Sequence, residues 1–212
     1  DIRDDDSVAV MILTGTGRAF SAGRDLKETQ AGAPPHDPIG PGGPWKALED
    51  MGKPVIAAVN GVCYTGAMNI AECCDIILAS EAATFCDTHS KYGMSGGGGV
   101  LTRLPRMVGL HKAKEIMFTC EPFSAQEAER IGFANKVVPA AKLMEAARDM
   151  AQKMIRNSRP SIQTQKSIFN KGFRASLVEA FEIEHREGEE FQRKRPVKDA
   201  EARVGAFAGK KK

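Results

Sequence analysis

The stretch PVIAAVNGVCYTGAMNIAECCDIILA, residues 54–79, decides the fold. It opens on an apolar run, residues 54–59, which is typical of a strand buried on both faces. An Asn-Gly pair ends that run, and small and apolar residues then recur at helical spacing over residues 66–74. A second buried strand, residues 75–79, follows. Strand, helix and strand in this order predict parallel pairing through a right-handed crossover.

Elements of the same kind extend this pattern along the chain. The run VAVMILT, residues 8–14, predicts another buried strand, and residues 83–86 predict a further short one. Residues 31–44 are rich in proline and glycine and predict a surface loop. From residue 100 onward the pattern is mostly helical. The remaining elements that we expect are helices over residues 45–51, 140–158, 161–171 and 177–193, and a strand over residues 134–138.

A helix-start signal lies shortly before the expected boundary between the α/β part and the helical part of the chain. Ser124 and Glu127 form a capping-box pattern, and Gly132 would close that helix in the left-handed conformation. We therefore expect two parts, an α/β part over residues 1–139 and a helical part over residues 140–212.

Composition argues against several classes of protein. Thirty basic and 27 acidic residues leave a net charge of only +3, which gives no reason to expect a nucleic-acid or membrane partner. The five cysteines form no C-x-x-C pair, and no histidine lies at metal-ligand spacing, so we expect reduced thiols, no metal site and a cytoplasmic location. The acidic start lacks the apolar segment of a signal peptide and an initiator methionine, which indicates a chain that begins inside a longer protein.

Two turns carry the first candidate chemistry. Ser21-Ala22-Gly23-Arg24 follows one strand, and the small-residue helix start at Gly66 follows another. Free backbone N–H groups at such turns can converge on one oxygen and form an oxyanion hole. On spacing alone, a plain strand-to-helix turn explains the first stretch equally well.

The residues around these turns strongly resemble the crotonase superfamily, the enoyl-CoA hydratase/isomerase family. The resemblance runs from Val8 to about Phe207, and GTGRAFSAGRDLKE, KPVIAAVNGV, CCDIILASEAATF, RLPRMVGLHKAKEIMFT and FSAQEAERIGFANKVVP carry it. It implies an α/β fold built as a spiral of ββα units, with a C-terminal helical trimerisation region. It also implies an acyl-CoA substrate, no further cofactor, and a homotrimer or homohexamer. The family's early strand, with an N-x-A-L-type segment, is missing here.

The resemblance assigns roles to particular positions. The oxyanion donors would be the backbone N–H groups of Arg24, which stands where the family has a small residue, and of Gly66. The residues implied to lie along coenzyme A are Ala22, Gly23, Asp25, Leu26 and Lys27, together with Phe207 and Lys210 near the C-terminus.

Two positions depart from the family pattern. Hydratases of this family use two glutamates to place and deprotonate a water, and these positions hold Asn69 and His89 here. An amide cannot exchange a proton at neutral pH, so Asn69 can orient a water but cannot act as a base. His89 can transfer a proton, and Asp87 either orients it or caps a turn. Glu72, three residues after Asn69, is expected to be a surface or structural carboxylate.

The sequence therefore predicts an acyl-CoA-thioester enzyme of the enoyl-CoA hydratase/isomerase type that stabilises a thioester enolate. Three alternatives stay open. The first is a decarboxylase or hydrolase of the same superfamily, because decarboxylation needs no strong base. The second is a non-catalytic acyl-CoA binder. The third is a Clp-type serine hydrolase that uses Ser90, His89 and Asp87, which rests on fold analogy alone.

Overall fold

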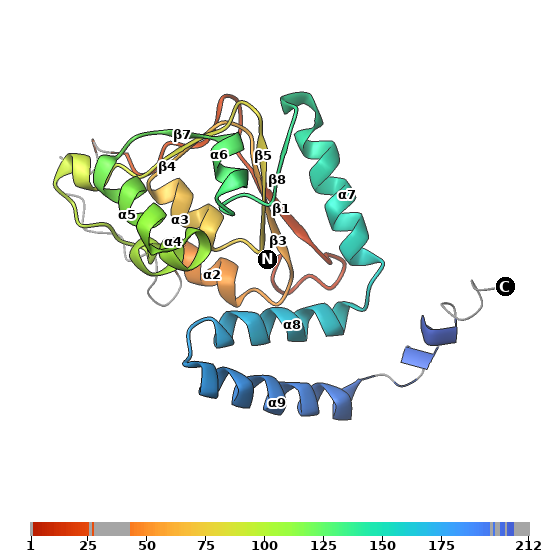
Figure 1. Cartoon of the computed structure of the whole chain (residues 1–212). Coiled ribbons are helices and arrows are strands. Elements are labelled where there is room, and N and C mark those ends of the chain that lie inside the picture. The colour runs from red at the N-terminus through yellow and green to blue at the C-terminus, as the bar shows by residue number, and fades with distance from the viewer. Residues whose placement is uncertain are drawn as a thin grey trace. The chain divides into compact units, whose positions relative to one another are not determined.

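The computed structural model describes residues 2–25, 27, 43–195, 197, 200–201 and 203–205. The chain forms two compact units, Asp1–Arg156 and Asn157–Lys212. The sequence suggested a division after residue 139. Helix α7 (Leu143–Ile155) lies instead within the first unit, because it packs against three strands of that unit, β1 (Met11–Thr14), β3 (Val55–Val59) and β5 (Ile76–Ser80) (Figure 1).

Two four-stranded sheets form the frame of the first unit. One has the order β1-β3-β5-β8 and is parallel throughout, and the other has the order β2-β4-β6-β7. Only the pair β6–β7 is antiparallel among the described strands. The strands are β1 (Met11–Thr14), β2 (Ala19–Ser21), β3 (Val55–Val59), β4 (Val62–Tyr64), β5 (Ile76–Ser80), β6 (Thr84–Cys86), β7 (Phe123–Ser124) and β8 (Lys136–Val138).

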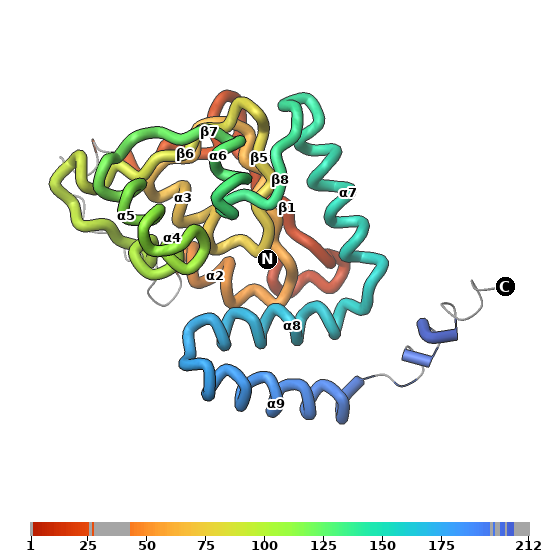
Figure 2. The backbone as a smooth tube through the Cα atoms, in the orientation of Figure 1, coloured from red at the N-terminus to blue at the C-terminus, as the bar shows by residue number. Residues whose placement is uncertain are grey.

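The chain winds through both sheets as a spiral. Each turn places one strand in the first sheet and the next strand in the second, and a helix then returns the chain, a path that can be followed along the tube in Figure 2. β3, β4 and α3 (Gly66–Glu72) make one such ββα turn, and β5, β6 and α4 (Val100–Val108) make another. The remaining helices of this unit are α2 (Pro44–Asp50), α5 (Leu110–Thr119), α6 (Ala125–Arg130) and two 3-10 turns, η1 (Ser90–Tyr92) and η2 (Ala140–Lys142). The predicted parallel pairing and ββα spiral are confirmed.

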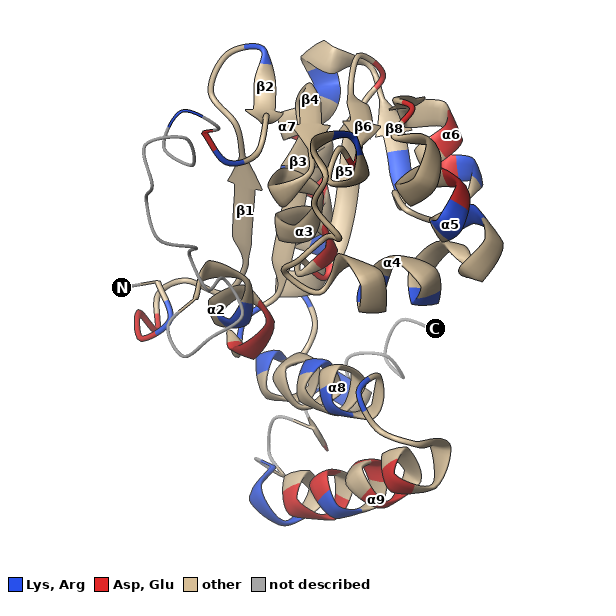
Figure 3. Ribbon diagram, turned by 90° about the vertical axis from the view of Figure 1, so that its left-hand side faces the viewer, with Lys and Arg blue, Asp and Glu red and all other residues tan. Residues whose placement is uncertain are grey.

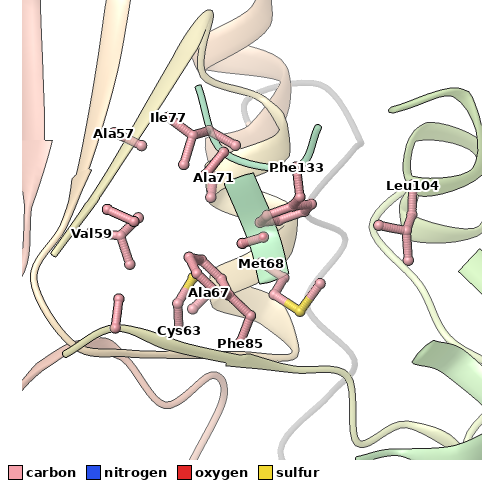
Figure 4. Close-up of a cluster of buried hydrophobic side chains, with 14 of the residues drawn as sticks. Ala57, Val59, Cys63, Ala67, Met68, Ala71, Ile77, Phe85, Leu104 and Phe133 are labelled. Carbon is pink, nitrogen blue, oxygen red and sulfur yellow. The ribbon is translucent and has the colours of Figure 1, made fainter. Parts of the chain in front are cut away.

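Strand β3 shows why its sequence is apolar throughout. All five of its residues are buried, and they belong to different hydrophobic clusters. Ala57 and Val59 pack with Phe85, Met68 and the face of α3, as Figure 4 shows. Ile56 and Ala58 pack on the other side with α7, and Val55 packs near α2. A strand covered on both faces has no position for a polar side chain, which is the pattern that the sequence predicted.

The capping-box prediction at Ser124 is half right. Ser124 Oγ accepts from Glu127 N at 3.1 Å, but the Glu127 carboxylate bonds Arg130 rather than returning to the helix start. Gly132 takes the predicted left-handed conformation, with φ of 79°. The complete capping box lies elsewhere, at Ser176 and Glu179, where the sequence did not predict one.

The second unit contains helices α8 (Arg159–Gly172) and α9 (Leu177–Lys194), which lie side by side as a helical hairpin (Figure 1). Glu187 of α9 accepts hydrogen bonds from Ser167 and Lys171 of α8. Glutamates are spread along α9, and Arg193 and Lys194 lie in its last turn; Figure 3 colours the acidic residues red and the basic residues blue on the ribbon. Of the helices in the described ranges, none combines the length and the apolarity that a bilayer crossing requires.

Candidate active site

The turn before α3 is held in an unusual backbone conformation. Thr65 has φ of 53° and ψ of −107°, a region that a β-branched residue adopts only under constraint. Two contacts supply that constraint: Thr65 N donates to Cys86 O at 2.8 Å, and the Thr65 and Thr88 hydroxyls lie 2.6 Å apart. Thr65 Oγ1 therefore bonds Thr88, in the loop after β6, and makes no cap bond to α3, which leaves the helix start at Gly66 without a side-chain acceptor.

The loop after β2 lies directly against this helix start. Gly23 has φ of +94°, and a Cβ atom there would meet Tyr64 O at 3.0 Å and Gly66 N at 3.5 Å. A Cβ atom on Gly66 would lie 4.0 Å from Arg24 N. Only glycine allows this approach at position 23. The structure thus brings together Arg24 and Gly66, the two residues whose N–H groups the sequence assigned to an oxyanion hole.

Asn69 lies one turn into α3 and is 1% exposed. Its Nδ2 donates to Gly97 O at 3.0 Å, which fixes the orientation of the amide because a carbonyl oxygen can only accept. A Cβ atom on Gly98 would lie 2.4 Å from this Nδ2 and 2.9 Å from the Trp45 ring. Asn69 Oδ1 is buried and has no hydrogen-bond partner among the described residues.

His89 and Asp87 form a fixed pair after β6. Both Asp87 carboxylate oxygens lie 2.9 Å from His89 Nδ1, and Asp87 Oδ1 also accepts from His89 N at 3.0 Å. Asp87 is fully buried, whereas 13% of the His89 side chain is exposed. With the Nδ1 hydrogen directed to Asp87, the other ring nitrogen is left for proton exchange. The described structure does not support the serine-hydrolase alternative, because Ser90 is exposed and makes no described hydrogen bond to His89.

For Glu72 the sequence left open a surface or a structural role, and the surface role is excluded. Glu72 is 7% exposed, and neither carboxyl oxygen has a hydrogen-bond partner in the described parts of the chain. Burial raises the pKa of Glu72 well above its usual value, Arg103 opposes the shift, and Asp87 adds to it. Arg103 is itself occupied by Glu49 of α2 and by Gly98 O at 2.6 Å.

The structure describes some of the residues that the resemblance places along coenzyme A. Ala22 and Asp25 are exposed beside Gly23, and Asp25 Oδ1 accepts from Lys27 N at 2.8 Å. Leu26, Phe207 and Lys210 lie outside the described residues.

Three residues of this region were not singled out from the sequence. Gly98, in the glycine loop over residues 93–99, lies against Asn69 and against Trp45 of α2, and Arg103 of α4 donates to Gly98 O. The run of four glycines was the one available signal, because close backbone approach needs residues without a Cβ atom.

Two buried cysteines near this site are poorly suited to act as nucleophiles. Burial raises the pKa of the Cys63 thiol well above its usual value and that of Cys86 to about 11, so neither is a ready thiolate. In the described ranges, no three His, Cys, Asp or Glu side chains are arranged to hold a metal ion.

Paired sheets, a ββα spiral and a glycine-lined helix start define a protein of the crotonase fold. The whole chain, residues 1–212, matches the family model described as enoyl-CoA hydratase/isomerase, and the chain belongs to that family.

Curated relatives and solved structures agree with this assignment. The chain is 38% identical to a carnitinyl-CoA dehydratase of Salmonella typhi over 80% of its own length and 66% of that protein. It is 35% identical to the short-chain-enoyl-CoA hydratase of Clostridium acetobutylicum over 100% of its own length and 82% of that protein. An enoyl-CoA hydratase subunit from Geobacillus kaustophilus superposes with a TM-score of 0.86 at 31% identity, over 98% of this chain and 80% of that one. The chain thus spans about two thirds of some curated relatives.

Proposed function

We propose that this chain acts on acyl-CoA thioesters as an enzyme of the enoyl-CoA hydratase/isomerase type. The backbone N–H groups of Arg24 and Gly66 polarise the thioester carbonyl and stabilise the enolate that forms when a proton is added or removed beside it. No metal or further cofactor takes part, and acyl-CoA is the substrate. The names of the relatives support this class of substrate.

The observation that carries the proposal is the Asp87–His89 pair beside the Gly66 turn. Thr88 stands between the two members of the pair and bonds Thr65, the residue that precedes Gly66. The proton-transfer group and the oxyanion donors are therefore tied together by one short hydrogen bond. Asp87 stabilises the imidazolium that forms when His89 takes a proton, and Asn69 positions water or substrate.

A second candidate, decarboxylation or hydrolysis of an acyl-CoA, draws support from Asn69. A buried amide replaces one of the two carboxylates that a hydratase of this family needs, and decarboxylation requires only stabilisation of the enolate. If the protein binds acyl-CoA but converts none, both enzymatic candidates are excluded.

Product analysis separates these candidates. Purified protein is incubated with a short-chain 2-enoyl-CoA and, separately, with a carboxylated acyl-CoA. The thioesters are separated by liquid chromatography, which resolves double-bond isomers of equal mass, and are identified by mass spectrometry. The proposal predicts gain of one water or movement of the double bond in the first incubation. Loss of carbon dioxide in the second, or free coenzyme A, would favour the second candidate. Unchanged thioesters in both would contradict an enzymatic role.

We also propose a homotrimer or homohexamer in the cytoplasm. Exposed aromatic and aliphatic side chains along α8 and α9 support the assembly: Phe169, Leu177, Val178 and Phe181 are 64–73% exposed. In such an assembly Phe207 and Lys210 would reach a coenzyme A site.

A further inference from the structure

Three buried acceptor atoms in α3 lack a donor. They are Asn69 Oδ1 and the two carboxyl oxygens of Glu72, and none has a hydrogen-bond partner among the described residues. The two residues are three apart on one helix, so their side chains are neighbours on the same face. A buried acceptor without a donor is costly, and three in one place need a common explanation.

One proton accounts for two of them, Asn69 Oδ1 and the protonated oxygen of Glu72, and turns the third into the carbonyl oxygen of a neutral acid, which costs less to leave unpaired than a carboxylate oxygen. A carboxylate can only accept hydrogen bonds, whereas a protonated carboxyl group also donates one. We infer that Glu72 is a neutral carboxylic acid in the folded protein, that its hydroxyl bonds Asn69 Oδ1, and that it thereby positions the Asn69 amide. Glu72 is then a positioning residue that acts through Asn69, and it deepens the proposed function by setting the polarity of that part of the site.

The surroundings of Glu72 support the neutral form. Two charged groups act on it, Arg103 from α4 and Asp87 from the loop after β6. The Arg103 guanidinium is occupied by Glu49 and Gly98 O, so it does not bond Glu72. Asp87 is a fully buried carboxylate, and a second negative charge nearby would be repelled by it.

The bond has a consequence for the site. Asn69 Nδ2 already donates one hydrogen to Gly97 O. An amide that is also held through Oδ1 cannot rotate to exchange its oxygen and nitrogen. Its second Nδ2 hydrogen is then the one donor of this amide that makes no hydrogen bond in the described structure. Where hydratases of the family present a carboxylate, this chain presents an N–H that binds an oxygen of water or of the substrate.

Infrared difference spectroscopy tests the proton directly, without any turnover. The C=O stretching band of a protonated carboxylic acid should be present in the native protein at pH 7 and absent in Glu72→Gln. The matched control is Glu81→Gln, which removes an exposed carboxylate and should leave the band unchanged. A native spectrum at pH 7 without a band that Glu72→Gln removes would overturn the inference, even if the protein proves to be an active hydratase.

A double-mutant cycle tests the link to Asn69. Glu72→Gln keeps a donor of the same shape and should leave kcat within about threefold, whereas Glu72→Leu should lower kcat about tenfold, the value of one neutral hydrogen bond. In an Asn69→Ala background, Glu72→Leu should have no further effect. The same cycle on the unfolding midpoint reports the coupling if no acyl-CoA substrate is turned over. Additive effects, or a Glu72→Gln variant as impaired as Glu72→Leu, would overturn the inference.

One other donor is available nearby and needs a control. Trp45 Nε1 is buried and unpartnered in the described structure. Trp45→Phe removes this N–H and keeps most of the ring, so the coupling between Glu72 and Asn69 should persist in it. Loss of the coupling in Trp45→Phe would assign the donor to the indole and refute the role of Glu72.

Discussion

His89 presents one ring nitrogen to Asp87 and keeps the other for exchange. His89→Ala should lower kcat by about 10²- to 10⁴-fold while the affinity for acyl-CoA changes little, because the imidazole moves a proton and does not hold the thioester. Steady-state kinetics and acyl-CoA binding, measured on both proteins, check this.

Asn69→Ala provides the comparison for His89. It removes hydrogen bonds that orient a bound oxygen, so it should cost about 1 kcal/mol and less than His89→Ala. An unchanged kcat in His89→Ala on the best substrate would remove His89 from the mechanism and leave the two backbone donors as the only chemistry.

Glu72 makes the stability of the fold depend on pH. Burial raises the pKa of Glu72, so the folded chain keeps a proton that the unfolded chain loses above its ordinary value of about 4.3. The free energy of unfolding should therefore fall as pH rises from there toward the raised pKa, by at most about 1.4 kcal/mol per pH unit. Urea denaturation at several pH values should show this slope in the native protein relative to Glu72→Gln. A difference that grows in favour of the native protein with rising pH would refute it.

The glycine loop before α4 offers a matched pair of substitutions. A Cβ atom on Gly98 would lie 2.4 Å from Asn69 Nδ2 and 2.9 Å from Trp45, and φ there is +64°. A Cβ atom on Gly97 would meet nothing within 4 Å. Gly98→Ala should therefore destabilise the fold by roughly 1–3 kcal/mol and lower activity, whereas Gly97→Ala should change neither by much. Urea denaturation and kinetics of the two variants check this, and equal effects would contradict the tight approach.

The start of α3 allows a donor to be deleted from the backbone. Gly66→Pro removes one N–H and should lower kcat by about 10²- to 10³-fold. Gly66→Ala keeps the N–H, and its Cβ atom would make only ordinary contacts at 3.8 and 4.0 Å, so it should lose much less. Proline is well suited to a first helical position but restricts Thr65 before it, so circular dichroism must show an intact helix content. Equal activity of the two variants would contradict a donor at Gly66.

The sequence predicts an element well when its own residues carry the pattern, and poorly when the element depends on contacts with segments that are distant along the chain. β3 and β5 were predictable because strands buried on both faces have an apolar pattern of their own. β2 and β4 have three residues each and were not among the predicted strands, since short strands depend on their neighbours in the sheet. In the site, Asp87 and His89 are close in sequence, and their pairing could be weighed from the sequence. The burial of Glu72 beside Arg103, and of Asn69 beside Trp45, joins distant segments that no local pattern connects.

At the scale of the whole molecule, the second unit has more apolar surface than a hairpin of two helices can cover. Leu177, Val178 and Phe181 lie within two turns of α9 and are each at least 64% exposed, and Phe169 of α8 is 73% exposed. Exposed aromatic and aliphatic side chains gathered in this way mark an interaction surface. Copies of the same chain are the partner that closed symmetry most often supplies.

The assembly can be tested through Phe181. Phe181→Asp places a charge on a surface that a subunit contact would bury, so it should shift the native assembly to smaller species, because an unpaired charge in an interface is costly. Glu182→Gln alters the adjacent position without touching the apolar side chains and should leave the assembly intact. Light scattering at micromolar concentration measures both. Because the first unit has its own core, Phe181→Asp should leave that unit folded by circular dichroism, so that a change of mass reports on association. A native protein that is already monomeric at this concentration would refute the trimer, and the exposed side chains of α8 and α9 would then need a different partner.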